Sequence, residues 1–376
     1  MKKLKKIVYI VESLEKGVGK HIQDLYLKIS DKKEFEIYIL YGMDRASEDI
    51  LKKIDSQNLV PIKNLKRKIG INDIKAIFEI NKHLKRIKPD IVHCHSSKAG
   101  LSGRISAKLS GVSYVIYSPH AYFFLKFDSK SFKRKLFICA ERLLSKFFSN
   151  ITITTSKGED DDFIKYKLDK KDKKILIEHG IEISEVSKKE IDDERRKYNV
   201  TDKNVFVGAM ARFEEQKDPI GTFEIMKKLT QNNSNVKCVF WGNGTFYDEV
   251  KKLNEENNNI IILPGETKTP EINLNALDIY LTASLYEGLP YTLLTSLAVG
   301  LPIAASNVEG NKDCVFDGKN GVLFDAKDYE GAVNKIEYII KENQFEQMKK
   351  ESLKIFKERF SMERMIEKYR SLYLDE

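Results

Sequence analysis

Short apolar runs alternate with amphipathic stretches along the whole of this 376-residue chain. The amphipathic stretches, such as residues 75–87 and 99–109, carry apolar side chains at helical spacing, whereas the apolar runs have the length of strands. Strands that alternate with helices predict parallel sheets covered by helices, so we expect an α/β fold. The expected strands form two groups: 7–11, 36–40, 90–93, 114–118 and 151–155, then 205–209, 236–241, 260–263, 279–283 and 302–305.

The length of the chain favours two domains, because single hydrophobic cores stop growing at about 250–300 residues. Between the two groups of strands, residues 183–203 are charged and poor in apolar side chains. We interpret them as a linker with a short helix at 192–198. The predicted domains therefore span residues 1–182 and 204–357.

Charge is divided unequally between the two halves. Residues 1–180 contain 38 Lys and Arg against 22 Asp and Glu, a net charge of +16, whereas the remainder contains 27 against 34, a net charge of −7. A basic half predicts an anionic partner, such as a membrane surface, a phosphorylated lipid or a nucleic acid. A lysine-rich composition without functional meaning is the alternative.

The cysteines and the apolar runs indicate the compartment. The four cysteines have no paired spacing, which favours a reducing cytoplasm over a disulfide framework. His93 and His95 flank Cys94, but no second Cys/His cluster in the sequence completes a metal shell, so we expect no metal site. No apolar run approaches the ~20 residues that span a bilayer, and the N-terminal run is too short for a signal peptide. We expect a cytoplasmic protein.

Three consecutive aspartates at 160–162 are a second candidate for metal binding. Ser156 followed three residues later by Glu159 is instead typical of a capping box, and further acidic residues favour a helix N-terminus. We predict the start of a helix here.

Residues 284–295 are the most informative segment for function. After a strand-like run comes Glu287, then Gly288 and Pro290 tighten the turn, and an amphipathic helix begins. This order places a carboxylate beside the positive end of a helix, at the sheet edge where α/β proteins bind ligands. A carboxylate accepts hydrogen bonds from sugar hydroxyls and free helix N–H groups suit a phosphate, so we interpret the segment as part of a sugar-nucleotide pocket. A structural turn with a solvated Glu is the alternative.

Two cations lie in one loop at the start of the second half. Arg212 and Lys217 follow a strand-like run and precede a helix, and together they could neutralise a diphosphate. Ion pairs of these cations with Glu214 and Glu215 are the alternative.

Glycines mark three further turns. Gly242 with Asn243, and then Gly265, follow strand-like runs, and each lets the backbone approach a ligand closely. In the first half, Lys16 and Gly17 open a predicted helix, which is the arrangement of a phosphate-binding loop.

Together these motifs resemble the retaining GT-B glycosyltransferases of family 4, which include many capsule and exopolysaccharide enzymes. The resemblance extends over nearly the whole chain, through the Gly17 loop, residues 90–100, 117–120 and 178–181, Arg212 with Lys217, and residues 287–290. It implies two facing Rossmann-like domains, of which the C-terminal one mainly holds the nucleotide sugar. It also implies that a final helix, residues ~358–376, packs on the first domain, and that no metal cofactor is used.

The resemblance assigns roles to individual residues. Those implied in catalysis are Arg212 and Lys217 on the diphosphate, Glu287 on the hydroxyls of the donor sugar, and His120 near the reacting sugar carbon. Those implied in donor binding are Lys16, Gly17, Gly242, Asn243, Gly265, Gly288, Leu289 and Thr295. Thr295 departs from the family, which usually has a ribose-binding Glu there, and a Thr cannot clamp two hydroxyls as a carboxylate does. Lys16 stands where a Gly is common.

The resemblance implies a retaining, metal-independent glycosyltransferase of bacterial surface-polysaccharide synthesis. We expect it to move a sugar from a UDP-sugar to a glycan or a polyprenyl-pyrophosphate-linked acceptor. The acceptor side is expected in the basic half, with His95, Lys98, Lys66 and Arg67. A nucleotide-sugar 2-epimerase of similar fold and a non-catalytic binder of anionic ligands stay open as alternatives.

Residues 131–148 have the pattern of a basic amphipathic helix. Such segments suit an anionic membrane surface, so we expect peripheral docking to the inner face of the cell membrane. An ordinary half-buried helix is the alternative. Loops suited to phosphates argue against a nucleic acid, and none is expected as a partner.

Overall fold

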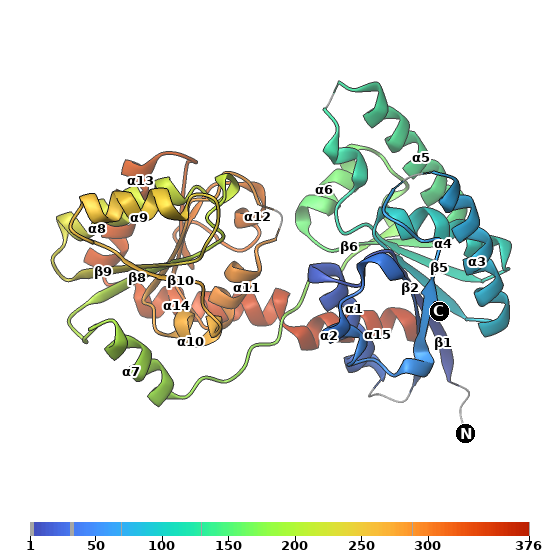
Figure 1. The fold of residues 1–376 in the computed structure, drawn as a ribbon, viewed down its shortest axis with the longest axis horizontal. Coiled ribbons are helices and arrows are strands. Elements are labelled where there is room, and N and C mark those ends of the chain that lie inside the picture. The colour runs from blue at the N-terminus through green and yellow to red at the C-terminus, as the bar shows by residue number, and fades with distance from the viewer. Residues whose placement is uncertain (1–3, 31–33, 69, 129, 288, 376) are drawn as a thin grey trace. The chain divides into compact units, whose positions relative to one another are not determined.

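The computed structural model describes residues 4–30, 34–68, 70–128, 130–287 and 289–375. The chain divides into two compact units. The first contains the residues up to His179 and those from Met365 onward, and the second is Gly180–Arg364. Each unit has one parallel β-sheet with helices on its faces (Figure 1). The α/β fold class predicted from the alternation of strands and helices is confirmed.

The sheet of the first unit has seven parallel strands in the order β3-β2-β1-β4-β5-β6-β7. The strands are β1 (Lys5–Val11), β2 (Phe35–Gly42), β3 (Leu59–Ile62), β4 (Ile91–His95), β5 (Tyr114–Ser118), β6 (Ile151–Thr154) and β7 (Lys174–Leu176). The helices are α1 (Lys16–Ser30), α2 (Glu48–Leu51), α3 (Ile71–Ile87), α4 (Ser97–Leu109), α5 (Phe132–Phe148) and α6 (Lys157–Lys165). β3 and β7 were not predicted. Pro61 interrupts the signal of β3, and the strand tolerates it because it lies at the edge of the sheet.

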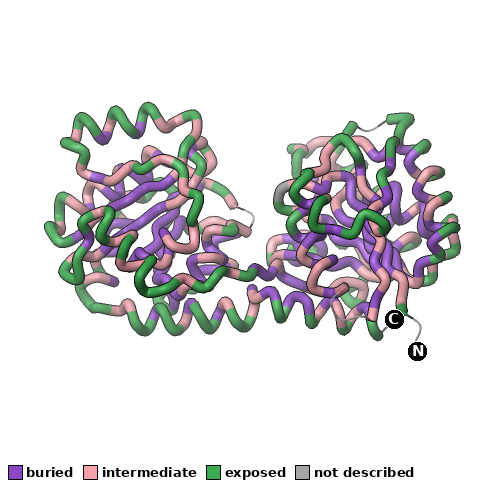
Figure 2. Tube along the Cα trace, turned by 60° about the horizontal axis from the view of Figure 1, so that its bottom comes forward, coloured by how far each residue is buried: buried purple, intermediate pink, exposed green. Residues whose placement is uncertain are grey.

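The alternation of side chains along β1 and β4 creates two different layers. Val8 and Cys94 belong to a core shared with α3 and α4. Tyr9, His93 and His95 point to the opposite face, where α1 and the last turns of α15 (Met362–Asp375) lie. Strands β1 and β4 are buried along most of their length (Figure 2).

The sheet of the second unit has six parallel strands in the order β10-β9-β8-β11-β12-β13. The strands are β8 (Val205–Met210), β9 (Val236–Trp241), β10 (Ile262–Gly265), β11 (Ile279–Thr282), β12 (Ile303–Ser306) and β13 (Gly321–Phe324). The helices that belong to this unit are α7 (Lys188–Lys197), α8 (Pro219–Asn232), α9 (Tyr247–Glu256), α10 (Pro270–Asn275), α11 (Tyr291–Ala298), α12 (Glu309–Lys312), α13 (Tyr329–Lys341) and α14 (Phe345–Ile355). β13 was not predicted, and β10 begins two residues later than expected.

The expected linker and the C-terminal segment both form contacts with the units beside which they lie in the structure. Helix α7, which lies inside the expected linker, contacts α10, and Arg195 pairs with Asp278 at 3.2 Å. At the chain end, Arg370 forms an ion pair with Glu34 of the first unit, and Lys5 Nζ donates to Tyr373 O at 3.1 Å. Within the described ranges, no helix combines the length and the apolar character needed to cross a membrane.

Candidate functional site

The predicted site of the second unit lies where its sheet reverses its order. Strand β8 has β9 on one side and β11 on the other, so the chain leaves β8 and β11 toward opposite faces of the sheet. In open parallel sheets this switch point leaves a crevice at the carboxyl ends of the strands, where ligands bind. The loops at residues 211–218 and 283–290 begin there.

Lys217 and Glu287 join these two loops. Lys217 Nζ forms an ion pair with Glu287 Oε1, and their side chains are 18% and 6% exposed. Gln216 adds two contacts, since its Nε2 donates to Tyr286 O at 2.9 Å and to Glu287 Oε2 at 3.5 Å. The backbone strengthens the junction because Leu285 N donates to Gln216 O at 2.8 Å. Gln216 was missed in the sequence, where nothing distinguishes it from a surface glutamine.

Arg212 lies in the same loop as Lys217, but its side chain is exposed. Among the described residues the Arg212 side chain has no hydrogen-bond or ion-pair partner. For these described side chains, the structure does not show the alternative in which Arg212 and Lys217 form ion pairs with Glu214 and Glu215. Glu214 Oε2 instead accepts a hydrogen bond from Thr245 Oγ1 at 2.8 Å. One cation of the loop is therefore compensated, and the other is exposed to solvent.

The glycines near this loop differ in the reason for their presence. Gly242 has a φ of +148°, and a Cβ there would meet Ala211 O at 1.8 Å, so close packing of two loops requires it. Asn243 is exposed, and its backbone O accepts a hydrogen bond from Phe213 N at 2.8 Å. Gly265 has a φ of +83°, and a Cβ there would have open space around it. Packing explains Gly242, whereas Gly265 leaves the backbone open to approach.

The turn before α11 holds the remaining donor-binding predictions. Gly288 lies outside the described residues, and Leu289 is half-buried. Thr295 Oγ1 donates to Tyr291 O at 3.0 Å, one helical turn earlier. Its hydroxyl proton is used within α11, which leaves the Thr295 oxygen to act toward a ligand as an acceptor.

In the first unit, the predicted phosphate loop lies within the first turn of α1, which starts at Lys16. The side chain of Lys16 lies outside the described part of the chain. A Cβ on Gly17 would meet nothing within 4 Å, so this part of the backbone is open. A Cβ on Gly19 would come within 2.6 Å of the Leu14 backbone, so Gly19 is the position that packing requires.

Several histidines gather at the carboxyl ends of β4 and β5. His95 ends β4, and its Nδ1 lies 3.0 Å from Nε2 of His120. His21 from α1 places its Nδ1 3.2 Å from Nδ1 of His179. His93 is bound on both ring nitrogens, by Tyr373 Oη at 2.7 Å and by Ser118 Oγ at 2.8 Å. We call His21, His93, His95, His120 and His179 the histidine cluster.

Burial controls the protonation of the histidine cluster. It lowers the pKa of His21, His95 and His120 well below the usual value near 6.5. It also lowers the pKa of His93 to about 3 and that of His179 to about 4. The rings are therefore neutral imidazoles at neutral pH, each with one N–H donor and one lone pair that can accept.

A buried carboxylate shapes the turn that contains His120. His120 and Ala121 have φ values of 49° and 88°, which non-glycine residues rarely adopt. Glu159 Oε1 accepts a hydrogen bond from Ala121 N, and its Oε2 accepts from Thr155 N at 2.8 Å and Thr155 Oγ1 at 2.9 Å. The predicted helix start is confirmed, because Ser156 Oγ accepts from Glu159 N at 3.2 Å. Only the Ser156 half of the predicted capping box forms, because the Glu159 carboxylate bonds Thr155 and Ala121 and not the Ser156 backbone.

The residues expected on the acceptor side separate into internal and exposed ones. His95 is fully buried. Lys98 is ion-paired with Asp73 and donates to Lys68 O at 2.9 Å, so it too is engaged. Lys66 lies 3.5 Å from Asp44 in a largely exposed pair, and Arg67 is exposed. Only the last two present accessible cations.

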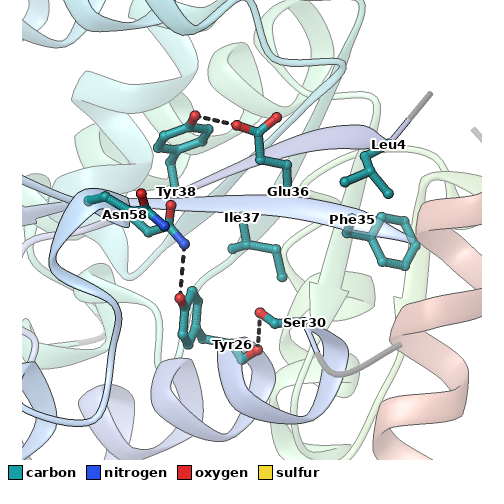
Figure 3. Close-up of a pocket in the computed structure, with 9 residues that line it drawn as sticks. Leu4, Tyr26, Ser30, Phe35, Glu36, Ile37, Tyr38 and Asn58 are labelled. Atoms are coloured by element: carbon teal, nitrogen blue, oxygen red, sulfur yellow. Dashed lines mark hydrogen bonds between the residues drawn. The ribbon is translucent and has the colours of Figure 1, made fainter. Parts of the chain in front are cut away.

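A hollow of about 280 Å³ in the first unit lies apart from the predicted site residues (Figure 3). Its walls include Leu4 and Phe35, which stand at the amino ends of β1 and β2, and Tyr26, which bonds Asn58 at 2.9 Å. None of the predicted site residues lines it. Since parallel sheets bind ligands at the carboxyl ends of their strands, this hollow is not the expected site.

Two family profiles match the chain. "Glycosyl transferases group 1" matches residues 190–356, and "Glycosyl transferase 4-like" matches residues 21–156. The chain is 29% identical over 316 residues to an Escherichia coli UDP-Gal:alpha-D-GlcNAc-diphosphoundecaprenol alpha-1,3-galactosyltransferase, covering 81% of this chain and 80% of that protein. It is 26% identical over 385 residues to the Escherichia coli O-antigen biosynthesis glycosyltransferase WclY, covering 98% of both.

Solved structures agree on the fold. The crystal structure of Anabaena HepE in complex with UDP matches with a TM-score of 0.80 at 16% identity, over 99% of this chain and 100% of that one. The lipopolysaccharide outer core galactosyltransferase WaaB matches with a TM-score of 0.76 at 16% identity, over 99% of this chain and all of that chain. With two parallel-sheet units and both family profiles matched, the chain belongs to the group 1, family 4-like glycosyltransferases of GT-B fold.

Proposed function

We propose that this glycosyltransferase moves a hexose from a UDP-sugar to a lipid-linked glycan in bacterial surface-polysaccharide synthesis, with retention at the anomeric carbon and without a metal cofactor. The observation that carries the proposal is the grouping of Arg212, Lys217 and Glu287 in loops at the β8–β11 switch point. These residues supply two cations for a diphosphate and a carboxylate for sugar hydroxyls.

The two cations have different tasks in this proposal. As the bond between the anomeric carbon and the diphosphate oxygen breaks, negative charge grows on the diphosphate and positive charge on the sugar. Exposed Arg212 is available to bind the phosphates in a bidentate manner, and half-buried Lys217 adds a point charge. Fixed charges of this kind stabilise the departing group more than they stabilise the bound substrate.

Retention follows if the acceptor hydroxyl attacks from the side of the leaving group. A new bond then forms between the acceptor oxygen and the anomeric carbon on the face that the diphosphate leaves. The hydroxyl proton passes to the departing diphosphate oxygen, so no separate protein base is required. Neutral His120 is proposed as the residue of the first unit that contacts the donor sugar through a hydrogen bond.

Glu287 is proposed to select the sugar. Its side chain is nearly buried and is oriented by Lys217 and Gln216, so its position is fixed before a ligand arrives. A positioned carboxylate oxygen accepts hydrogen bonds from two neighbouring hydroxyls of a hexose. Discrimination among UDP-sugars should therefore depend on Glu287.

The relatives support the proposed donor and acceptor classes. The name of the Escherichia coli galactosyltransferase gives UDP-Gal as donor and a GlcNAc-diphosphoundecaprenol as acceptor. Anabaena HepE has been crystallised with UDP and with UDP-glucose. We propose a UDP-sugar and an undecaprenyl-diphosphate-linked glycan for this chain.

An apolar face on α5 supports docking to the membrane that carries such an acceptor. Phe132, Leu136, Leu143 and Phe147 are 78%, 57%, 52% and 55% exposed, and their spacing places them on one side of the helix. Exposed cations flank this face: Lys133, Lys135, Arg142 and Lys146. Apolar side chains bordered by lysines fit an anionic lipid surface, and the charge of +16 on residues 1–180 adds long-range attraction.

Product analysis tests the reaction itself. Incubated with a panel of UDP- and GDP-sugars and an undecaprenyl-diphosphate-linked GlcNAc, the protein is expected to consume a UDP-sugar and to form an α-linked product from an α-configured donor. The anomeric coupling constant in the NMR spectrum of the product gives the configuration. A β-linked product would refute retention, and an epimerised nucleotide sugar formed without acceptor would favour a 2-epimerase.

Arg212→Ala should lower kcat by about 10²-fold or more, because one of two charges on the departing diphosphate is lost. The measurement is the initial rate at saturating donor. Arg196→Ala is the matched control, since Arg196 is an exposed arginine on α7, paired only with neighbouring Asp193 among the described residues, and should leave the rate unchanged. A rate for Arg212→Ala close to that of the control contradicts the assigned role.

Glu287→Gln should weaken the binding of the UDP-sugar more than the binding of UDP. Loss of a charge-assisted hydrogen bond costs about 1.5–3 kcal/mol, which corresponds to about 10- to 100-fold in the Kd of the donor. Calorimetry with UDP and with the preferred UDP-sugar measures the difference directly. Glu256→Gln, at an exposed position on α9, is the control. Equal losses for UDP and UDP-sugar would show that Glu287 does not contact the sugar.

The double variant Phe132→Ser/Phe147→Ser should bind anionic vesicles at least about tenfold more weakly than the parent, because each large apolar side chain contributes about 1.5–3 kcal/mol when fully buried. Flotation with phosphatidylglycerol vesicles at moderate salt measures the bound fraction. Tyr338→Ser, in an exposed position of the second unit, is the control. No flotation of the parent protein, with or without lipid-linked acceptor, would eliminate membrane docking.

A further inference from the structure

Five of the six histidines of the chain meet in the histidine cluster, although they come from four separate segments. Neighbouring ring centroids lie between 3.9 Å, for His93 and His95, and 6.0 Å, for His21 and His95. The sixth histidine, His83, lies on α3 outside this group. The reaction proposed above uses one of these five rings, so the convergence of the others needs a separate explanation.

Three members of the cluster have the geometry of a metal site. One ring nitrogen each from His21, His95 and His120 lies within 4.8 Å of the other two. Tetrahedral Zn²⁺ with Zn–N bonds of about 2.0–2.1 Å requires nitrogens about 3.3 Å apart. The contact His95 Nδ1–His120 Nε2, at 3.0 Å, is close to this separation, and the His21 nitrogen lies within 4.8 Å of the other two ligand atoms.

The hydrogen bonding of the cluster is incomplete without a further group. His95 is fully buried, yet its Nε2 has no hydrogen-bond partner among the described residues. Buried polar atoms without a partner are rare and cost free energy. With the proton of His21 on Nε2, where Tyr369 Oη lies 3.4 Å away, its Nδ1 carries a lone pair toward His179. In each of the two contacts between imidazole nitrogens one ring donates and the other accepts, and a cation bound there would take the place of the shared proton.

The donor set selects a class of cation. The three-histidine group includes no carboxylate, and imidazole favours Zn²⁺, Ni²⁺, Co²⁺ and Cu²⁺ over Mg²⁺ and Ca²⁺. His120 and His179 are only half-buried, so an ion can reach the group from solvent.

We propose that His21, His95 and His120 form a binding site for a borderline transition-metal ion such as Zn²⁺, and that its occupation inhibits the transferase. The metal is a ligand of the first unit and not a cofactor of the reaction. Inhibition rests on the proposed function, in which the free imidazole of His120 contacts the donor sugar. A metal ion that takes the lone pair of His120 removes that contact and places a positive charge beside it.

Metal binding is measured on untagged full-length protein that carries Cys139→Ser, because Cys139 is an exposed thiol and could itself bind the ion. Calorimetry with Zn²⁺, and visible absorption with Co²⁺, should show one equivalent bound with a tetrahedral Co²⁺ spectrum. Mg²⁺ should give no signal. Zn²⁺ affinity should fall at least about tenfold in His95→Gln and His120→Gln, since each removes one of three ligands.

His83→Gln is the matched control and should bind Zn²⁺ like the parent. Replacement of the half-buried His120 should disturb the fold less than replacement of the fully buried His95. Circular dichroism checks the folding of both variants. The site is refuted if the parent binds no Zn²⁺, or if His95→Gln and His120→Gln bind it as tightly as His83→Gln does.

Inhibition is measured separately, as the rate of transfer with and without Zn²⁺ and after addition of a chelator. Reversible inhibition of the parent and of His83→Gln supports the second part of the proposal. Zn²⁺ bound at one equivalent without any loss of rate overturns the inhibition but not the site. If no sugar is transferred under any condition, the proposed function fails, while the Co²⁺ spectrum still decides whether the histidines bind metal.

Discussion

Parallel strand pairing is the constraint on which both functional regions depend. In each sheet the first strand, β1 or β8, is internal, and every connection must cross a face before the next parallel strand begins. All carboxyl ends therefore meet at one edge, and the loops diverge where the strand order reverses. This geometry brings Lys217 to Glu287 across 70 residues of sequence, and His21 to His95 and His120 in the first unit.

The two units use this edge in opposite electrostatic ways. In the second unit the loops carry full charges, with Lys217 neutralised by Glu287 and Arg212 exposed to solvent. In the first unit the same position is filled by imidazole and phenol rings whose burial keeps them uncharged. The exposed Arg212 makes the first kind of site suited to a charged ligand group, whereas the second kind suits neutral polar groups or an ion that coordinates nitrogen.

Local sequence signals were sufficient for the fold class and for the loops that carry Arg212, Lys217 and Glu287. They failed for β7 and β13, which are only three and four residues long, and for β3, where Pro61 interrupts the pattern. The histidine cluster could not be anticipated, because its members are distant in sequence and meet only through strand order. The steric need for Gly242 likewise depends on a neighbour that spacing does not reveal, whereas the hydrogen bond of Thr295 is made within its own helix.

The ion pair between Lys217 and Glu287 has a consequence for turnover. Because the lysine already has a nearly buried counterion, a small anion such as inorganic phosphate gains little by approaching it, and the same holds for the nucleotide that remains after the sugar has gone. Only a molecule that offers hydroxyls to the carboxylate and phosphates to the lysine at once compensates for loosening that pair. In the proposed reaction, the loop junction would thus favour the intact donor over the nucleotide that remains after transfer.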